Sequence, residues 1–423
     1  MSPSRSVPGD ASLPKVPALS EPTVNVRAGW VAAVVLVNVG INAAFFGPLQ
    51  VLLAQQAQAL DPVNKEAILA LVTGCGAAVS LVANPIFGAF SDRTTSRFGR
   101  RVPWVLGGAV LGVAALLGLA GAPNIAAMTI LWCLVQTGCN GAVAAITATV
   151  PDRVPRAQRG RIGGLVGMGV TVGLVGGAVI AAVVAGFVAG YIVCAVALFL
   201  SVVPYVVNSH DARLDPADRP PFSWSRFVAG FYISPRQYPD FGWAWLTRFL
   251  VNLGNHIVTL YLFYFLQDAV GYPEPANGVL ILTGLYAAMT IVTAVLGGRL
   301  SDRMGKRKPI VIASSAVIAA ASLILAFFPT MTGAIIGALV LGIGFGAYLA
   351  VDFALLTEVL PTAADRGKDM GVINVANSLP QVLAPVIAGP LVLTAGGYLT
   401  LYVTSAVIGL LGAVFVVKIK SVA

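Results

Sequence analysis

Two charged side chains, Arg248 and Asp352, stand inside long apolar runs of this 423-residue chain. A charge in such a setting is costly unless an opposite charge compensates it. Each lies about six or seven positions from the same end of its run, so we expect them to face one another as an ion pair. Asp352 could then exchange a proton when the site opens to either side, with Glu358 and His256 as further titrating candidates. The alternative interpretation is a permanently ionised structural pair.

Neutral polar side chains recur at helical spacing in several other apolar runs, where positions four apart share one face. The predicted substrate-binding set is Asn38, Asn42, Phe46, Gln136, Asn140, Asn252, Asn255, His256, Tyr348, Asn377 and Gln381. Amides donate and accept hydrogen bonds and aromatic faces stack on rings, which suits an uncharged, polyhydroxylated ligand. The alternative is that these amides only join neighbouring helices.

The apolar runs themselves indicate the fold class. The chain is 57% hydrophobic and 10% charged, whereas a soluble domain carries roughly a quarter charged residues. Runs of roughly 20 apolar residues in lipid must be helices, because each backbone polar group needs an internal partner. We therefore predict an all-α membrane protein. The predicted spans are 30–55, 67–90, 103–121, 125–149, 162–186, 188–207, 242–267, 277–298, 309–328, 332–356, 370–394 and 397–417.

These spans group into two halves. We expect a disordered cytoplasmic tail at 1–26, six-helix bundles at 27–208 and 241–423, and a cytoplasmic linker at 209–240. Lys and Arg gather in alternate links, which by the positive-inside rule places both termini in the cytoplasm of a cell (plasma or inner) membrane. The net charge of +9 follows this placement and does not indicate nucleic-acid binding. The four cysteines have no metal-ligand spacing and predict no disulfide.

A charged link between spans occurs twice. Gly88 to Arg101 reads G-A-F-S-D-R-T-T-S-R-F-G-R-R, and Gly298 to Lys308 reads G-R-L-S-D-R-M-G-K-R-K. The predicted gating residues are Gly88, Asp92, Arg93, Arg97, Gly99, Arg100 and Arg101 in the first copy and Gly298, Asp302, Arg303, Gly305 and Lys306 in the second. A second repeat, at Asp152 and Glu358, also supports a duplicated six-helix unit with its substrate site between the halves.

The doubled link resembles the signature of the major facilitator superfamily, and the resemblance covers essentially the whole chain. It implies two pseudo-symmetric bundles that rock about a central cavity, with Asp92 and Asp302 as latch carboxylates on the cytoplasmic side. The stretch from Ser91 to Pro103 is similar to the same loop in plant sucrose transporters and their relatives. The stretch from Asn84 to Gly88 is more distantly similar to melibiose-type sugar–cation symporters, with Asn84 at their acidic position.

We therefore expect proton symport of a mono- or disaccharide by alternating access, with a small-molecule substrate and the lipid bilayer as partners. The expected protein is a monomer and no enzyme, and it needs no metal or cofactor beyond the transmembrane proton gradient. Efflux of a drug or metabolite in exchange for protons, and uncoupled facilitation, are the alternatives. The first six spans hold no buried carboxylate, so any coupling runs through the second half. The fifth span lacks the Gly-Pro signature of multidrug antiporters, which argues against efflux.

Overall fold

The computed structural model describes residues 22–208, 211, 213–219, 223–229, 236–304, 307–358, 366–393 and 396–420. The regular elements in these ranges are helices. In the first half they are α1 (Ala28–Gly47), η1 (Pro48–Leu52), α2 (Leu53–Leu60), α3 (Lys65–Ser91), α4 (Val102–Ala120), α5 (Ile125–Arg153), α6 (Arg156–Val183) and α7 (Phe187–Asn208). Between the halves lie η2 (Pro216–Asp218) and α8 (Trp224–Ala229). In the second half they are α9 (Pro239–Leu260), α10 (Leu262–Tyr264), η3 (Phe265–Ala269), α11 (Pro275–Met304), α12 (Lys308–Phe327), α13 (Met331–Glu358), α14 (Arg366–Leu393) and α15 (Gly397–Val416).

The predicted spans correspond to these helices. Eleven are long and apolar enough to cross a membrane, and α9 with α10 and η3 makes a twelfth if the bent pair is one span. The bend of 43° follows Leu260, near the predicted outer end of that span. A wide turn at η1 begins at Pro48, which has no N–H for the helical ladder, and the first span continues through it to Leu60. The helices therefore confirm the all-α membrane fold that the sequence predicts.

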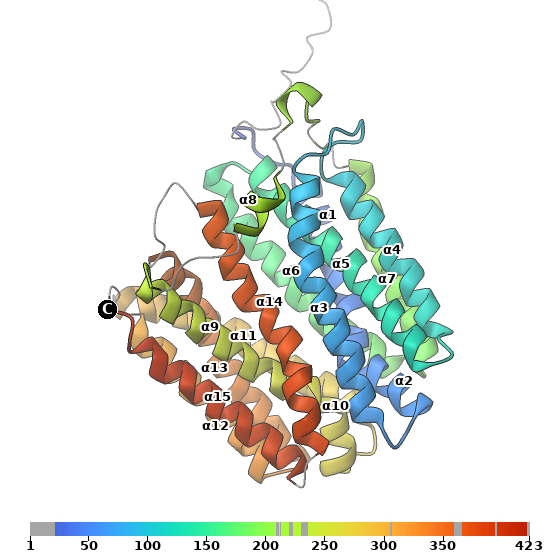
Figure 1. The fold of residues 1–423 in the computed structure, drawn as a ribbon, viewed down its shortest axis with the longest axis vertical. Coiled ribbons are helices and arrows are strands. Elements are labelled where there is room, and N and C mark those ends of the chain that lie inside the picture. The colour runs from blue at the N-terminus through green and yellow to red at the C-terminus, as the bar shows by residue number, and fades with distance from the viewer. Residues whose placement is uncertain are drawn as a thin grey trace, which may run out of the picture.

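The two halves pack their helices in the same way. In the first half α1 packs against α6 and α7, α3 against α5, and α4 against α5 and α7. In the second half the equivalent helices repeat these pairs: α9 packs against α14 and α15, α11 against α13, and α12 against α13 and α15. Across the middle, α3 meets α14 and α6 meets α11, which relates the halves by a pseudo-two-fold axis. Figure 1 shows α3 and α14 side by side between the two groups of helices.

Glycines set the closest helix contacts in the first half. A Cβ on Gly138 of α5 would lie 2.5 Å from the carbonyl oxygen of Gly108 on α4, and the same holds in reverse. On α6, a Cβ on Gly177 would lie 2.5 Å from the backbone nitrogen of Gly47 at the end of α1. Small residues allow this approach in lipid, where van der Waals packing drives helix association. The close contacts fix how α1 and α5 are rotated about the central cavity.

Polar contacts tie the halves together at the predicted outer end. Lys65, at the start of α3, forms an ion pair with Asp268 of η3 at 2.7 Å. Tyr264 donates to the carbonyl of Ala54 at 2.7 Å, and Tyr261 donates to that of Glu66 at 3.0 Å. In Figure 1 this end is marked by α2 and α10, which lie next to one another. We call these contacts the outer clasp.

Candidate functional site

A central cavity of about 330 Å³ lies between the halves. Its polar lining residues are Gln50, Thr73, Gln136, Asn252, Asn255, His256, Thr259, Thr283, Tyr286, Asn377 and Gln381. The rest of the lining is apolar or aromatic and includes Phe45, Phe46, Leu174, Leu282, Leu341 and Phe345. Among the described residues that line it, none is an Asp, Glu, Lys or Arg. The wall therefore suits a solute with a sizeable apolar body and a few uncharged polar groups.

Seven residues of the predicted substrate-binding set line this cavity, and four do not. Those on the wall are Phe46, Gln136, Asn252, Asn255, His256, Asn377 and Gln381. The others are Asn38, Asn42, Asn140 and Tyr348, whose binding role stays a prediction. Asn38 and Asn42 face α6, because their Cβ atoms would lie 3.5 and 2.6 Å from a Cβ added at Gly169 and Gly173. Their side-chain amides donate to carbonyls one turn earlier in α1, at 2.9 and 2.7 Å.

Asn140 lies behind the wall as well, but it supports a residue on it. Its amide donates to the carbonyl oxygen of Gln136 at 2.9 Å and to the side-chain oxygen of Gln136 at 3.0 Å. Asn140 thereby orients the Gln136 side chain. The predicted set omitted several wall residues, among them Thr259 and Phe345. Phe345 carries a signal that could have been noticed, since it stands three positions before Tyr348 on the same helix face.

Arg248 and Asp352 meet as an ion pair, as the sequence predicts. Both are buried, and the pair is held by two further side chains. Tyr348 donates to the second carboxylate oxygen of Asp352 at 2.5 Å, and the Nε of Arg248 donates to Asn377 at 2.7 Å. Asn377 is on the cavity wall. One hydrogen bond therefore separates the buried charges from the space where a solute would bind.

The ion pair and its Asn377 partner all lie in the second half of the protein. Arg248 is on α9, Asp352 is on α13 and Asn377 is on α14. The coupling roles of Arg248 and Asp352 remain predictions. Glu358 is the last residue of α13, and its side chain lies outside the described residues.

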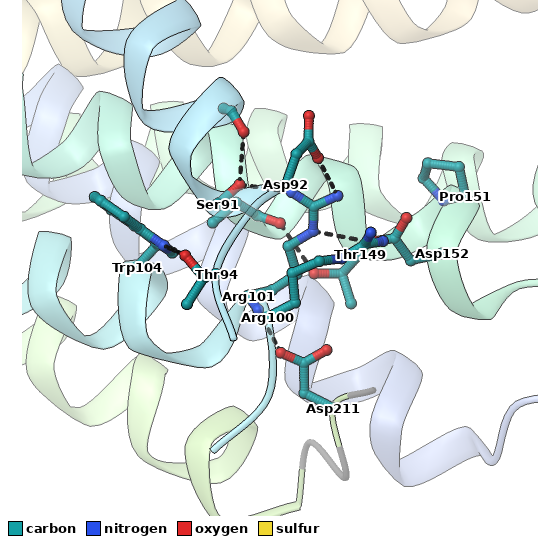
Figure 2. Close-up of polar contacts among 12 residues, drawn as sticks. Ser91, Asp92, Thr94, Arg100, Arg101, Trp104, Thr149, Pro151, Asp152 and Asp211 are labelled. Carbon is teal, nitrogen blue, oxygen red and sulfur yellow. Dashed lines mark hydrogen bonds and ion pairs between the residues drawn. The ribbon is translucent and has the colours of Figure 1, made fainter. Parts of the chain in front are cut away.

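The first signature loop forms a compact charge network (Figure 2). Arg101 is at its centre, with Nη2 at 2.6 Å from Asp92 and Nε at 2.7 Å from Asp152. Arg100 also reaches Asp152 at 2.6 Å, and Arg101 donates to the Ser91 hydroxyl at 2.5 Å. Burial disfavours the charge on Arg101, but Asp152 and Asp92 outweigh it and raise the pKa of the guanidinium. Two arginines and two carboxylates thus join the ends of α3, α4 and α5.

Asp211, in the linker that follows α7, also contacts this network. Its carboxylate accepts hydrogen bonds from the backbone N–H groups of Arg101 and Val102, the latter at 3.0 Å, and so caps α4 (Figure 2). Gly99 makes room for it: its φ is +97°, and a Cβ there would lie 2.4 Å from the Cβ of Asp211. Burial raises the pKa of Asp211 despite these two hydrogen bonds. The sequence does not predict this role, because the short motif offers no signal for it.

Other predicted gating residues take peripheral positions. Arg93 donates to the carbonyl of Ala89 at 2.6 Å near the end of α3, and Arg97 stacks on the Phe98 ring. A Cβ added at Gly88 would lie 4.0 Å from the Cβ of Ala144 on α5.

The second copy of the loop is described only in part. Gly298 and Arg303 lie on α11, with Arg303 exposed, whereas Gly305, Lys306 and the Asp302 side chain lie outside the described residues. Ser301 is buried and accepts from Arg307 at 3.5 Å, which parallels the bond between Ser91 and Arg101. A Cβ added at Gly298 would lie 4.0 Å from the Cβ of Ala350, the same distance as from Gly88 to Ala144 in the first copy. The two loops share local geometry although the first has four more residues between Ser and Arg, as their residue numbers show.

Residues 31–288 and 275–422 match the Major Facilitator Superfamily, and the chain belongs to this family. It is a multi-pass membrane transporter. Its fold is similar to that of the peptide transporter POT in complex with sulfate, with a TM-score of 0.75 and 14% identity over 95% of this chain and 96% of that one. It is also similar to a point mutant of the nucleoside transporter NupG, with a TM-score of 0.72 and 14% identity over 92% of this chain and 100% of that one. At these identities the likeness shows the fold alone.

Two sequence relatives are named as multidrug resistance proteins. Multidrug resistance protein MdtL of Klebsiella pneumoniae subsp. pneumoniae is 32% identical over 181 residues, which are 41% of this chain and 45% of that protein. MdtL of a Shewanella species is 33% identical over 149 residues, 34% of this chain and 37% of that protein. The matched region is thus less than half the length of either relative. The resemblance to sucrose transporters is not supported by these relatives, which favour the efflux alternative.

Proposed function

We propose that this protein exports a small amphipathic solute, a drug or a metabolite, in exchange for protons by alternating access. The observation that carries the proposal is the composition of the central cavity, in which apolar and aromatic side chains surround uncharged amides. Such a wall gains most from a ligand that buries a large apolar surface. The MdtL relatives add support, since both are named for multidrug resistance.

Proton-coupled sugar symport is the second candidate. Gln136, Asn252 and Gln381 favour it, because amides from both halves meet in one cavity and can bond several hydroxyl groups. The apolar lining residues, such as Leu174 and Leu341, argue against a sugar substrate. The hydroxyl groups of a sugar would lie against these side chains without hydrogen-bond partners.

Asp352 is the proton-exchanging group in either candidate, with Arg248 as its counter-ion. When the carboxylate takes a proton it loses the charge that holds Arg248, and the Asn377 amide then remains as a partner of the guanidinium. A change in the protonation of Asp352 would therefore alter the contact between Arg248 and Asn377, which lies on the cavity wall. If Asp352 is only structural, the protein is an uncoupled facilitator.

We further propose the topology that the charge distribution predicts. Both termini lie in the cytoplasm, residues 27–208 and 241–423 form the two moving bundles in the plasma or inner membrane, and residues 209–240 link them. The signature loops then face the cytoplasm and the outer clasp faces the opposite side. A single chain contains a complete cavity, so a monomer suffices for transport.

Reconstituted protein separates these candidates. Proteoliposomes with a pH-sensitive dye inside are given either radiolabelled glucose and maltose or radiolabelled neutral aromatic amides and alcohols, with and without a pH gradient. We expect an outward-directed proton flux coupled to entry of the aromatic compounds, and none with the sugars. Sugar-driven proton entry would instead establish symport. Asp352→Asn should abolish the proton flux, and transport of unchanged rate without any gradient would establish a facilitator.

A further inference from the structure

Three aromatic rings connect the cavity wall to the buried carboxylate of Asp352. Tyr286 and Phe345 both line the cavity, and their ring centroids are 6.1 Å apart. The Phe345 ring lies 6.1 Å from the ring of Tyr348, at an angle of 32° between their planes. Tyr348 in turn donates its hydroxyl to Asp352 at 2.5 Å. Because aromatic pairs in contact have centroids about 4.5–7 Å apart, the rings form a continuous packed row from the cavity to the carboxylate.

Burial gives Phe345 and Tyr348 different roles in this row. Phe345 is half-buried and lines the cavity, so a bound solute can pack directly against its ring. Tyr348 is only 1% exposed and is not among the lining residues. A solute in the cavity would therefore act on Tyr348 through Phe345 and not by touching it. The hydroxyl of Tyr348 is directed away from the cavity, at the buried Asp352.

Two groups among the described residues contact the carboxylate of Asp352. They are Arg248, from α9, and Tyr348, one turn earlier on α13. The helices α11 and α12 also pack against α13, but their described residues place no charged side chain in contact with Asp352. A hydroxyl that donates to a carboxylate stabilises the ionised form, and the strength of the bond depends on its alignment. Once the carboxylate has bound a proton, the same hydroxyl can turn and accept.

We propose that Tyr348 is a positioning residue that transmits occupancy of the cavity to Asp352. A solute packed against Phe345 holds that ring against Tyr348, which then keeps its hydroxyl directed at the carboxylate. The ionised form is thereby favoured, and Asp352 releases its proton to water when the solute binds. When no solute is bound, Phe345 can move into the free space, Tyr348 donates less well, and Asp352 binds a proton more readily. Exchange of a solute for a proton requires this order of events, so the inference rests on the proposed function.

Binding of a neutral probe over a pH series tests this role. Tritiated 2-naphthylmethanol has an aromatic body and no group that titrates near neutral pH, so any pH dependence belongs to the protein. Its affinity for the purified full-length protein in lipid nanodiscs is measured by scintillation proximity. We expect binding at least about tenfold tighter at high pH, where Asp352 is ionised, than at low pH. In Tyr348→Phe, which keeps the ring but loses the hydroxyl, the midpoint of this change should move to higher pH by about one pH unit.

Two further variants complete the test. Phe345→Leu keeps an apolar wall but removes the ring that contacts Tyr348, so the affinities at high and low pH should differ by less than about threefold. Tyr191→Phe is the matched control, because the Tyr191 hydroxyl is also buried but donates to the neutral side chain of Gln56, at 2.8 Å in the first half. This variant loses a buried hydrogen bond and should leave the midpoint where it is.

The outcomes distinguish this inference from the proposed function. An unmoved midpoint in Tyr348→Phe, or an undiminished pH dependence in Phe345→Leu, would overturn the role of Tyr348 and leave proton exchange at Asp352 intact; if Tyr348→Phe does not fold, Phe345→Leu decides. An equal shift in Tyr191→Phe would reveal a general structural effect and also overturn that role. Binding to the unmodified protein that is independent of pH, or tighter at low pH, would overturn the exchange and the inference together. Absence of probe binding would overturn the amphipathic cavity, and the inference with it.

Discussion

Loss of one partner of the Arg248–Asp352 ion pair should destabilise the protein much more than loss of both. Asp352→Leu leaves a buried guanidinium that cannot lose its proton, with only Asn377 as a described side-chain partner. Removing one member of a buried pair costs about 3–5 kcal/mol, whereas replacing both members by apolar residues is often neutral or stabilising. Arg248→Met should cost less than Asp352→Leu, because the remaining carboxyl can take up a proton and keep its bond to Tyr348.

The free energy of unfolding of the single variants and of the double variant completes a double-mutant cycle. The proteins are purified in detergent and heated while tryptophan fluorescence is recorded. At about 2 °C per kcal/mol for a large chain, we expect Asp352→Leu to lower the Tm by about 6–10 °C. The double variant should recover at least about 2 kcal/mol of the summed loss. Additive effects, or an Arg248→Met variant less stable than Asp352→Leu, would refute the reasoning.

Three further predictions concern the ends and the helix contacts. Asp211→Ala should lose the cap of α4 and about 1 kcal/mol of stability, whereas Asp211→Asn keeps an acceptor and should be neutral in thermal unfolding. Folding raises the pKa of the Asp211 carboxyl above its usual value of 3.8. The contribution of Asp211 to the free energy of unfolding should therefore fall as the pH rises above 3.8, and it should not fall on acidification. Thermal unfolding measured over a pH series checks this. Lys65→Ala removes the ion pair with Asp268, which is worth about 0.2–1 kcal/mol. A cysteine placed at Thr283 should then be labelled from the outer side up to about fivefold faster. Unchanged labelling would mean that the outer clasp does not hold the halves together. Gly138→Val should lower the Tm strongly because its side chain would meet the backbone of α4, and a normal Tm would show that α4 and α5 can separate freely.

Interior polar residues show where prediction from the sequence stopped. The spacing of Asn38 and Asn42 is the same as that of any amide stripe on a cavity-lining helix, yet these two side chains face the glycines of α6. Asn252 and Asn255 have similar sequence surroundings and do line the cavity. Helical spacing shows that residues share a face, but the rotation of the helix against its neighbours decides what that face meets.

The ion pair of Arg248 and Asp352 could be predicted from the sequence in part. The depth of Arg248 and Asp352 in their spans was sufficient to predict that they meet, because an unpaired charge in the membrane interior is too costly to be left alone. Their contacts with Tyr348 and Asn377 could not be predicted, since these depend on how α9, α13 and α14 converge. The connection from the buried charges to the cavity wall is therefore a product of the tertiary structure.

By itself the sequence determined that the chain crosses a membrane as a duplicated set of helices with charged loops between them, because hydrocarbon leaves an apolar segment few other conformations. Only the tertiary structure decided which amides line the cavity and that Asp211 from the linker caps α4. These features depend on groups far apart in the chain. Local pattern does not encode such distances, and they follow only from the packing of all the helices together.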